Sequence, residues 1–184
     1  MIQLDTSWLQ HVQKPARYTG GEYNSIVKNH STVDITMALG FPDVYEVAMS
    51  HLGIKILYGL VNRREDAVAE RVFAPWHDME EEMRKRNIPL FSLETRTPIK
   101  DFDVLAFTLQ YEMSFTNILN MLDLAGIPMY AKDRDMDFPL LVCGGPCAYN
   151  VEPIADFFDI VSLGESEEWG DEFIDLLKAE KAKG

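Results

Sequence analysis

The sequence predicts a doubly wound α/β domain, flavodoxin-like or Rossmann-like, built on a parallel sheet of five strands. Apolar segments of strand length alternate with segments of helical periodicity along residues 33–182. The links between these segments are short and rich in Gly and Pro. Residues 104–109 form a continuous apolar run, which is typical of a central parallel strand buried on both faces. This alternation favours right-handed crossovers and the strand order 2-1-3-4-5.

The first half of the chain contains an irregular segment followed by two principal strands and two helices. Residues 1–31 lack clear periodicity, so we expect an N-terminal extension packed on a domain that spans 32–184. Leu52, Ile56 and Leu60 fall at helical spacing, with Ser50 as the expected cap. The elements expected here are a strand at 33–39, a helix at 49–63, a strand at 70–74, a helix at 78–86 and a short additional strand at 90–93.

The second half supplies the other three principal strands and two longer helices. Ser114 is expected to cap a helix whose buried stripe consists of Phe115, Ile118, Leu122 and Ala125. The closing helix is expected to turn four side chains inward, namely Trp169, Phe173, Leu176 and Leu177. The expected elements are a strand at 104–109, a helix at 114–125, a strand at 140–143, a helical turn at 154–158, a strand at 160–163 and a helix at 167–182.

Charge and hydropathy limit the classes of partner. Of the 184 residues, 17 are Lys or Arg and 30 are Asp or Glu, which gives a net charge of −13 at pH 7. Such a chain repels nucleic acid, and its basic runs are short, such as the pair Arg63-Arg64 and the triplet Arg84-Lys85-Arg86. The sequence has no apolar run approaching the roughly 20 residues of a membrane span, and because residues 1–14 are polar and mixed we expect no signal peptide. We therefore expect a cytoplasmic protein that contacts neither membrane nor nucleic acid.

The candidate site follows from a rule of open α/β sheets, whose ligands bind outside the carboxyl ends of the strands. Glycines at these ends let a ligand approach the backbone closely, and polar side chains there can form hydrogen bonds to the ligand. A tight strand exit, or a helix start with acidic caps, would explain the same glycines and carboxylates without a ligand. His51, near the same rim, is expected to be a structural hydrogen-bonding residue. The candidate cofactor-binding residues are Thr108, Gln110, Tyr111, Gly144, Gly145, Pro146, Gly164, Glu165 and Glu167.

Several motifs of known chemistry are missing from the sequence. It has no G-x-G-x-x-G after the first strand, no G-x-x-x-x-G-K-[ST] and no G-x-S-x-G. Cys143 and Cys147 have no further Cys or His nearby to complete a zinc or iron–sulfur site. We therefore assign no catalytic residue and no metal ligand to this chain.

The glycine turns after the last two strands carry a family resemblance. Gly144-Gly145-Pro146 and Gly164-Glu165-Ser166-Glu167 resemble the strand ends of the cobalamin-binding-like N-terminal domain that precedes many radical S-adenosylmethionine (radical SAM) domains. The chain is similar along nearly its whole length to one uncharacterised subfamily of these proteins. The residues that carry this similarity are Lys14 to Glu22, Phe41 to Glu46, Met49 to Gly53, Glu70 to Trp76 and Leu109 to Glu112.

The resemblance implies an accessory domain that binds cobalamin or shapes the substrate side of a radical SAM domain, present in cis or in trans. It places the four-iron cluster and S-adenosylmethionine in that radical domain, which we expect to be absent from this chain because no third cysteine completes C-x-x-x-C-x-x-C. Ser50-His51-Leu52-Gly53 also departs from the D-x-H-x-x-G of enzymes that ligate cobalt through histidine. Two alternatives are a cofactor-free docking module and, less favoured, a flavin-binding domain.

Overall fold

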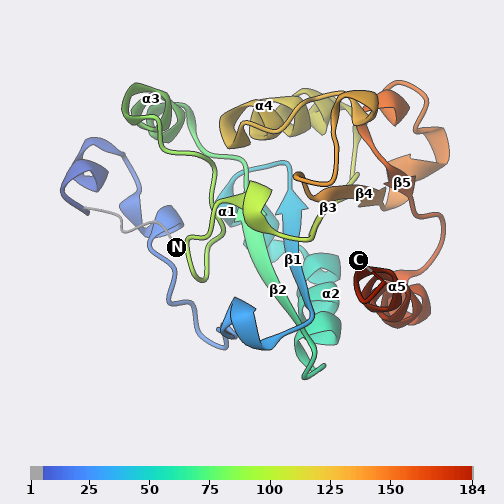
Figure 1. Ribbon diagram of the computed structural model, residues 1–184. Coiled ribbons are helices and arrows are strands. Elements are labelled where there is room, and N and C mark those ends of the chain that lie inside the picture. Colours follow the sequence, from blue (N-terminus) through green and yellow to red (C-terminus); the bar gives the residue numbers. More distant parts are fainter. Residues whose placement is uncertain (1–5, 184) are drawn as a thin grey trace.

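The computed structural model describes residues 6–183 and confirms the predicted fold class (Figure 1). Five parallel strands form one sheet in the order β2-β1-β3-β4-β5, which is the predicted flavodoxin-like order. The strands are β1 (Ile35–Phe41), β2 (Ala67–Phe73), β3 (Val104–Thr108), β4 (Leu140–Gly144) and β5 (Ile160–Val161).

Helices cover both faces of the sheet, as a doubly wound fold requires (Figure 1). Helices α3 and α4 lie on one face, while α1, α2 and α5 lie on the other. Within the part of the chain that the structure describes, no helix is both long and apolar enough to cross a membrane. The helices are α1 (Tyr45–Ser50), α2 (Leu52–Asn62), α3 (His77–Arg86), α4 (Phe115–Ala125) and α5 (Ser166–Lys181).

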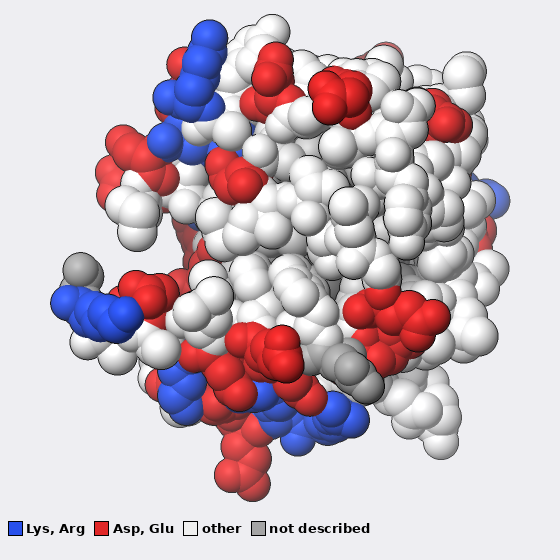
Figure 2. All heavy atoms as spheres, turned by 90° about the vertical axis from the view of Figure 1, so that its right-hand side faces the viewer, with Lys and Arg blue, Asp and Glu red and all other residues white. Residues whose placement is uncertain are grey.

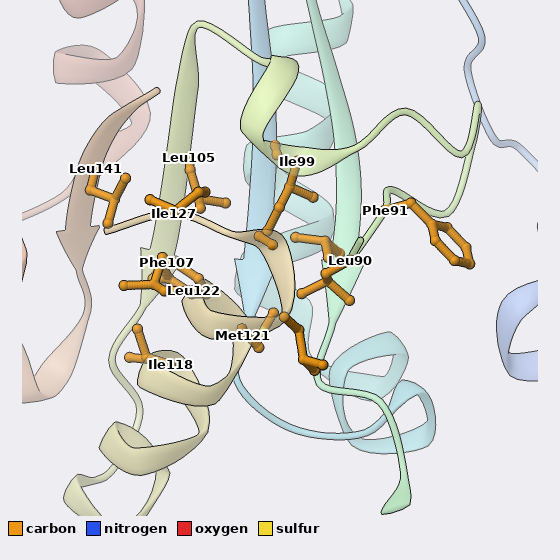
Figure 3. Packing of buried hydrophobic residues seen from close by; sticks show 14 of the residues in the cluster. Leu90, Phe91, Ile99, Leu105, Phe107, Ile118, Met121, Leu122, Ile127 and Leu141 are labelled. Atoms are coloured by element: carbon orange, nitrogen blue, oxygen red, sulfur yellow. The ribbon is translucent and has the colours of Figure 1, made fainter. Parts of the chain in front are cut away.

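Each face of the sheet has its own hydrophobic core. On the α4 face, Ile118, Met121 and Leu122 share one buried cluster with Leu105 of β3 and Leu141 of β4 (Figure 3). Ile118 and Leu122 belong to the stripe predicted for this helix, because residues spaced by three and four share one helical face. The core on the other face combines side chains of β1 with those of α2 and α5, including Leu39, Ile54, Phe173 and Ile174.

The outer edge of β2 is closed by side chains. The amide of Asn62 bonds both N and O of Ala69, at 3.1 and 2.9 Å. The carboxylate of Glu94 accepts from the backbone N of Arg71 at 2.7 Å. The ammonium of Lys28 donates to the carbonyl oxygen of Ala67 at 2.7 Å. An edge strand normally exposes these groups as a template for another chain, and here they are occupied.

Residues 14–30, which we call the N-terminal strap, run along the β2 side of the domain (Figure 1). Arg17 and Lys14 both pair with Glu46 at the start of α1, at 2.9 Å. At the other end of the strap, Nε2 of His30 lies 2.7 Å from the carboxylate of Glu70 in β2. The first five residues of the predicted extension lie outside the described part of the chain.

The prediction of one helix at 49–63 is wrong in one respect. The structure has two helices in this region, α1 and α2, which are separated at His51. The Ser50 hydroxyl donates back to the carbonyl oxygen of Glu46 at 2.7 Å, so Ser50 ends α1 and does not cap the second helix. His51 has extended backbone, and its Nδ1 accepts from the backbone N of Ile54, which makes it the cap of α2. Leu52 and Ile56 are consequently exposed, at 69% and 39%.

Three smaller predictions also need correction. Residues 90–93 form no strand, since their backbone contributes only one antiparallel bridge, between Phe91 and Pro98. Ser114 stands at the start of α4, but its hydroxyl donates back to the carbonyl oxygen of Tyr111 instead of capping the helix. In α5, Leu176 is 59% exposed, and Ile174 occupies the buried position in its place.

Candidate functional site

A cavity of about 270 Å³ opens where the strands end. Its floor is formed by the carboxyl-terminal parts of β1, β3 and β4, and its walls by α2 and α5. This is the edge at which open α/β sheets bind ligands. Most lining residues are apolar, including Leu39, Ile54, Leu57, Val142 and Phe173.

The structure brings most of the predicted site residues together at this cavity. Seven of them line it, namely Thr108, Gln110, Gly144, Gly145, Gly164, Glu165 and Glu167. Two predicted residues do not. Tyr111 is 48% exposed on the loop after β3, and Pro146 begins the short turn Pro146–Asn150, where the chain leaves the cavity. Whether the seven bind a cofactor stays a prediction.

Three polar side chains that line the cavity form one hydrogen-bonded chain from the start of α2 to the end of β3. Nε2 of His51 lies 3.1 Å from Oε1 of Gln110, and Nε2 of Gln110 lies 2.5 Å from Oγ1 of Thr108. Nδ1 of His51 accepts from the backbone N of Ile54 at 3.3 Å. Both ring nitrogens of His51 are therefore occupied, which is the structural hydrogen-bonding role expected for this residue.

The glycine turn after β4 lies tightly against the end of β3. Gly145 has φ of 102°, and an added Cβ would stand 3.0 Å from the carbonyl oxygen of Leu109 and 3.1 Å from Oγ1 of Thr108. The backbone fixes this approach, because Leu109 N donates to the carbonyl oxygen of Gly144 at 2.7 Å. Only glycine allows the two loops to meet here.

The opposite wall is the first half of α5. The rings of Trp169 and Phe173 stack with centroids 4.5 Å apart, and both residues line the cavity. The guanidinium of Arg64 anchors the helix by bonding Asp171 and Asp175 while it also pairs with Asp66. The aromatic wall is thus held in place by ion pairs on the outer side of the helix.

The charges around the cavity are few and negative. None of its described lining residues is Lys or Arg, and Glu165 and Glu167 are exposed at its mouth. Figure 2 shows the side of the molecule where β5 and α5 lie, and there Lys and Arg are confined to the margins of a largely uncharged face. The site is therefore suited to neutral ligand parts more than to phosphates.

The two thiols are poorly suited to chemistry. Burial raises the pKa of the Cys143 thiol to about 12, and burial also raises the pKa of Cys147. Since the thiolate is the reactive form, the raised pKa values make both thiols weaker nucleophiles at neutral pH. Among residues 6–183, the structure contains no cluster of three or more groups able to hold a metal ion.

Sequence reasoning missed part of the cavity wall. Trp169 and Phe173 were expected to face inward, but only as core, and Gly53 was not assigned a role. An added Cβ at Gly53 would stand 2.9 Å from Cε1 of His51, so this glycine leaves room for the imidazole. The sequence did contain a signal for this contact, because Gly53 stands two residues after His51 in Ser50-His51-Leu52-Gly53.

Comparison with known proteins identifies the family of this chain. The family described as "Radical SAM proteins, N-terminal" matches residues 53–184. The chain is 28% identical over 134 residues to "Uncharacterized protein MJ0966" of Methanocaldococcus jannaschii, a match that covers 71% of this chain. The matched part spans only about a quarter (24%) of the length of that relative. The matched residues include α2 from its second residue, all strands from β2 to β5, and α5, so this chain belongs to the family of N-terminal domains of radical SAM proteins.

Proposed function

We propose that the domain holds a corrinoid, of which cobalamin is the type, at the carboxyl edge of its sheet and presents it to a radical SAM domain. The observation that carries this proposal is the cavity of about 270 Å³ at that edge, which seven of the nine predicted site residues line. Its volume suits the edge of a macrocycle or one flat ring of a nucleotide tail. The remainder of such a cofactor would lie on the open edge outside the cavity.

The residues present fit a corrinoid held without a protein ligand to cobalt. Gly144 and Gly145 line the cavity with backbone atoms, which a flat ring could approach closely. Both nitrogens of His51 are used within the protein, at Ile54 and Gln110. The imidazole could reach a metal only by giving up the contact with Gln110. When bound, the corrinoid would supply organometallic chemistry that this chain's own residues do not provide.

The protein's own part is to bind, orient and shield. Thr108 and Gln110 offer hydrogen bonds at one end of the cavity, and Glu165 and Glu167 offer acceptors for ligand amides at its mouth. The stacked Trp169 and Phe173 provide a flat apolar wall that excludes water. These contacts fix the position of a ligand without reacting with it.

A flavin mononucleotide is less compatible with this site. Its phosphate would need cations or a cradle of backbone N–H groups. The described cavity lining has no Lys or Arg, and the N-terminus of α5 begins beside the carboxylate of Glu165. Flavin binding is therefore the weaker of the two cofactor hypotheses.

Spectroscopic titration with hydroxocobalamin tests the proposal. We expect the red chromophore to co-elute with the protein and its visible spectrum to shift on binding. Gly170→Leu is the blocking variant, because Gly170 lines the cavity and an added Cβ there meets nothing within 4 Å. Gly59→Leu is the matched control, because Gly59 is also helical with open space around it but does not line the cavity. A colourless protein fraction at high ligand excess would overturn the proposal.

A second candidate function, a docking module without cofactor, is favoured by the exposed apolar side chains near the same edge. Tyr111 (48%), Met113 (79%), Tyr149 (75%) and Leu163 (62%) follow three adjacent strands and remain open to solvent. Exposed apolar patches of this kind mark interaction surfaces. This function predicts that the domain binds a separately expressed radical SAM domain but not hydroxocobalamin, and that Met113→Glu weakens the complex.

A further inference from the structure

In the hydrogen-bonded chain formed by His51, Gln110 and Thr108, the chemistry of the groups determines which atom donates and which accepts at each step. The backbone N–H of Ile54 can only donate, so Nδ1 of His51 must be the unprotonated nitrogen. A neutral imidazole then carries its proton on Nε2, which donates to Oε1 of Gln110. The amide nitrogen of Gln110 in turn donates to Oγ1 of Thr108. Each member thus determines the role of the next.

The consequence appears at the last member of the chain. A threonine hydroxyl has one donor and two acceptor positions, and the amide of Gln110 occupies an acceptor position. Within the described residues, the Thr108 hydroxyl accepts from Gln110 but donates to no protein group. Thr108 lines the cavity, so its hydroxyl hydrogen can point there.

We propose that His51, acting through Gln110, orients the Thr108 hydroxyl as a hydrogen-bond donor toward the cavity. The site then selects a flat ligand part that carries an uncharged acceptor atom, such as a ring nitrogen or a carbonyl oxygen. His51 is a positioning residue, and Thr108 contacts the ligand. The inference rests on the proposed function because it concerns the same cavity, but it does not require the ligand to be a corrinoid.

Two features of the cavity agree with a flat and uncharged ligand part. The Trp169 and Phe173 rings are stacked with only 13° between their planes, which forms a wall suited to a planar ring. The described lining has no Lys or Arg, and carboxylates stand at the mouth. Gly53 leaves room for the His51 ring, because any side chain at this position would meet it. The ring of Phe41 also lies beside the imidazole, with its centroid 5.1 Å from that of His51.

Binding of benzimidazole and indole, measured by calorimetry or ligand-observed NMR at pH 7.5, tests the proposal. The two bicyclic probes have nearly the same shape, but only benzimidazole carries an unprotonated ring nitrogen that can accept. We expect the protein to bind benzimidazole about 5- to 10-fold more tightly, since one buried hydrogen bond differs between the probes. The preference should vanish in Thr108→Val, persist in Thr108→Ser and weaken in His51→Phe.

The outcomes separate this inference from the proposed function. Equal affinity for the two probes, no binding of benzimidazole at millimolar concentration, or a preference that survives in Thr108→Val would overturn it. Thermal unfolding of each variant shows whether the fold is intact, and Thr108→Ser keeps the test decisive if Thr108→Val unfolds. Failure to bind hydroxocobalamin alongside a clear benzimidazole preference would reject the corrinoid and retain the oriented donor.

Discussion

The buried carboxylate of Glu70 in β2 lies 2.7 Å from Nε2 of His30 in the N-terminal strap. Its other oxygen accepts from the hydroxyl of Ser92 at 2.6 Å and from both the hydroxyl and the backbone N of Thr95. One side chain with no solvent exposure thus joins the strap, the sheet and the loop that follows α3. A buried acid of this kind is costly to disturb, because its donors lose their acceptor when it is removed.

We predict that Glu70→Ala lowers the free energy of unfolding by about 3–5 kcal/mol. The buried hydroxyl of Ser92 would lose its acceptor, and the hydroxyl of Thr95 would keep only Oγ1 of Thr97, 2.7 Å away. Glu70→Gln is the control, because its amide oxygen can still accept from these groups while its NH₂ faces His30. Urea unfolding should show a much smaller loss for Glu70→Gln, and equal losses for the two variants would contradict this account.

A second prediction concerns pH and the start of the strap. Hydrogen bonds from Arg17 and then Lys14 lower the pKa of Glu46 to about 2. A carboxyl with a lowered pKa contributes stability above its unfolded pKa of about 4.3, and this contribution is lost as the pH falls toward 2. Because the Glu46 side chain is 44% exposed, we expect less than about 1 kcal/mol.

Urea titrations of wild type and Glu46→Gln between pH 6 and pH 3 measure this contribution. The stability difference between the two proteins should shrink steadily as the pH falls below about 4. In the background of Arg17→Met, which removes the main cause of the lowered pKa, the same substitution should have little pH dependence. A difference that stays constant with pH would exclude the ion pair as its source.

The third prediction concerns the anchoring of α5. Arg64 is the main hydrogen-bonding partner that, with Lys178, holds the pKa of Asp66 well below its usual range. Arg64 also bonds Asp171 and Asp175 on the helix. We expect Arg64→Met to speed amide hydrogen exchange in α5 and to destabilise the domain by about 1–2 kcal/mol, while exchange in α4 changes little. Equal acceleration in both helices would indicate global destabilisation instead.

The fourth prediction separates backbone strain from a steric clash at the glycine turns. Gly145 and Gly164 both have positive φ, of 102° and 101°. An added Cβ at Gly164 meets nothing within 4 Å, whereas at Gly145 it meets the Leu109 carbonyl oxygen at 3.0 Å. We expect Gly164→Ala to cost about 1–2 kcal/mol and Gly145→Ala clearly more, as measured by urea unfolding. Equal costs would mean that the turn at Gly145 shifts to relieve the clash, so that only the backbone strain common to both positions remains.

The strands could be predicted from the sequence because their signal is local. The apolar run at 104–109 and the Gly-bounded runs at 140–143 and 160–163 identify β3, β4 and β5, and alternation with helices gives their order. The break at His51 could not be predicted in this way. Its causes are the contact with Gln110, 59 residues away, and the packing against Phe41.

The sequence could predict the edge of the sheet at which the candidate site lies, but not all of the side chains that line it. The carboxyl ends of parallel strands meet at one edge, so the loops after β3, β4 and β5 had to be neighbours. The course of the chain beyond each strand was not determined by that rule. The turn into Glu112–Ser114 carries Tyr111 out of the cavity, while α5 brings Trp169 and Phe173 to it, and both depend on packing between distant elements.

The side chains that close β2 have a consequence for the order of synthesis. Lys28 and Asn62 precede β2 in the chain, but Glu94 follows Arg71 by 23 residues, so the edge at Arg71 remains open until the loop that carries Glu94 has left the ribosome. Until then, an apolar strand with unpaired backbone groups is a hazard for association with other nascent chains. Glu94 thus protects the edge of the folded domain, but it cannot protect this edge during the part of synthesis that precedes its own appearance.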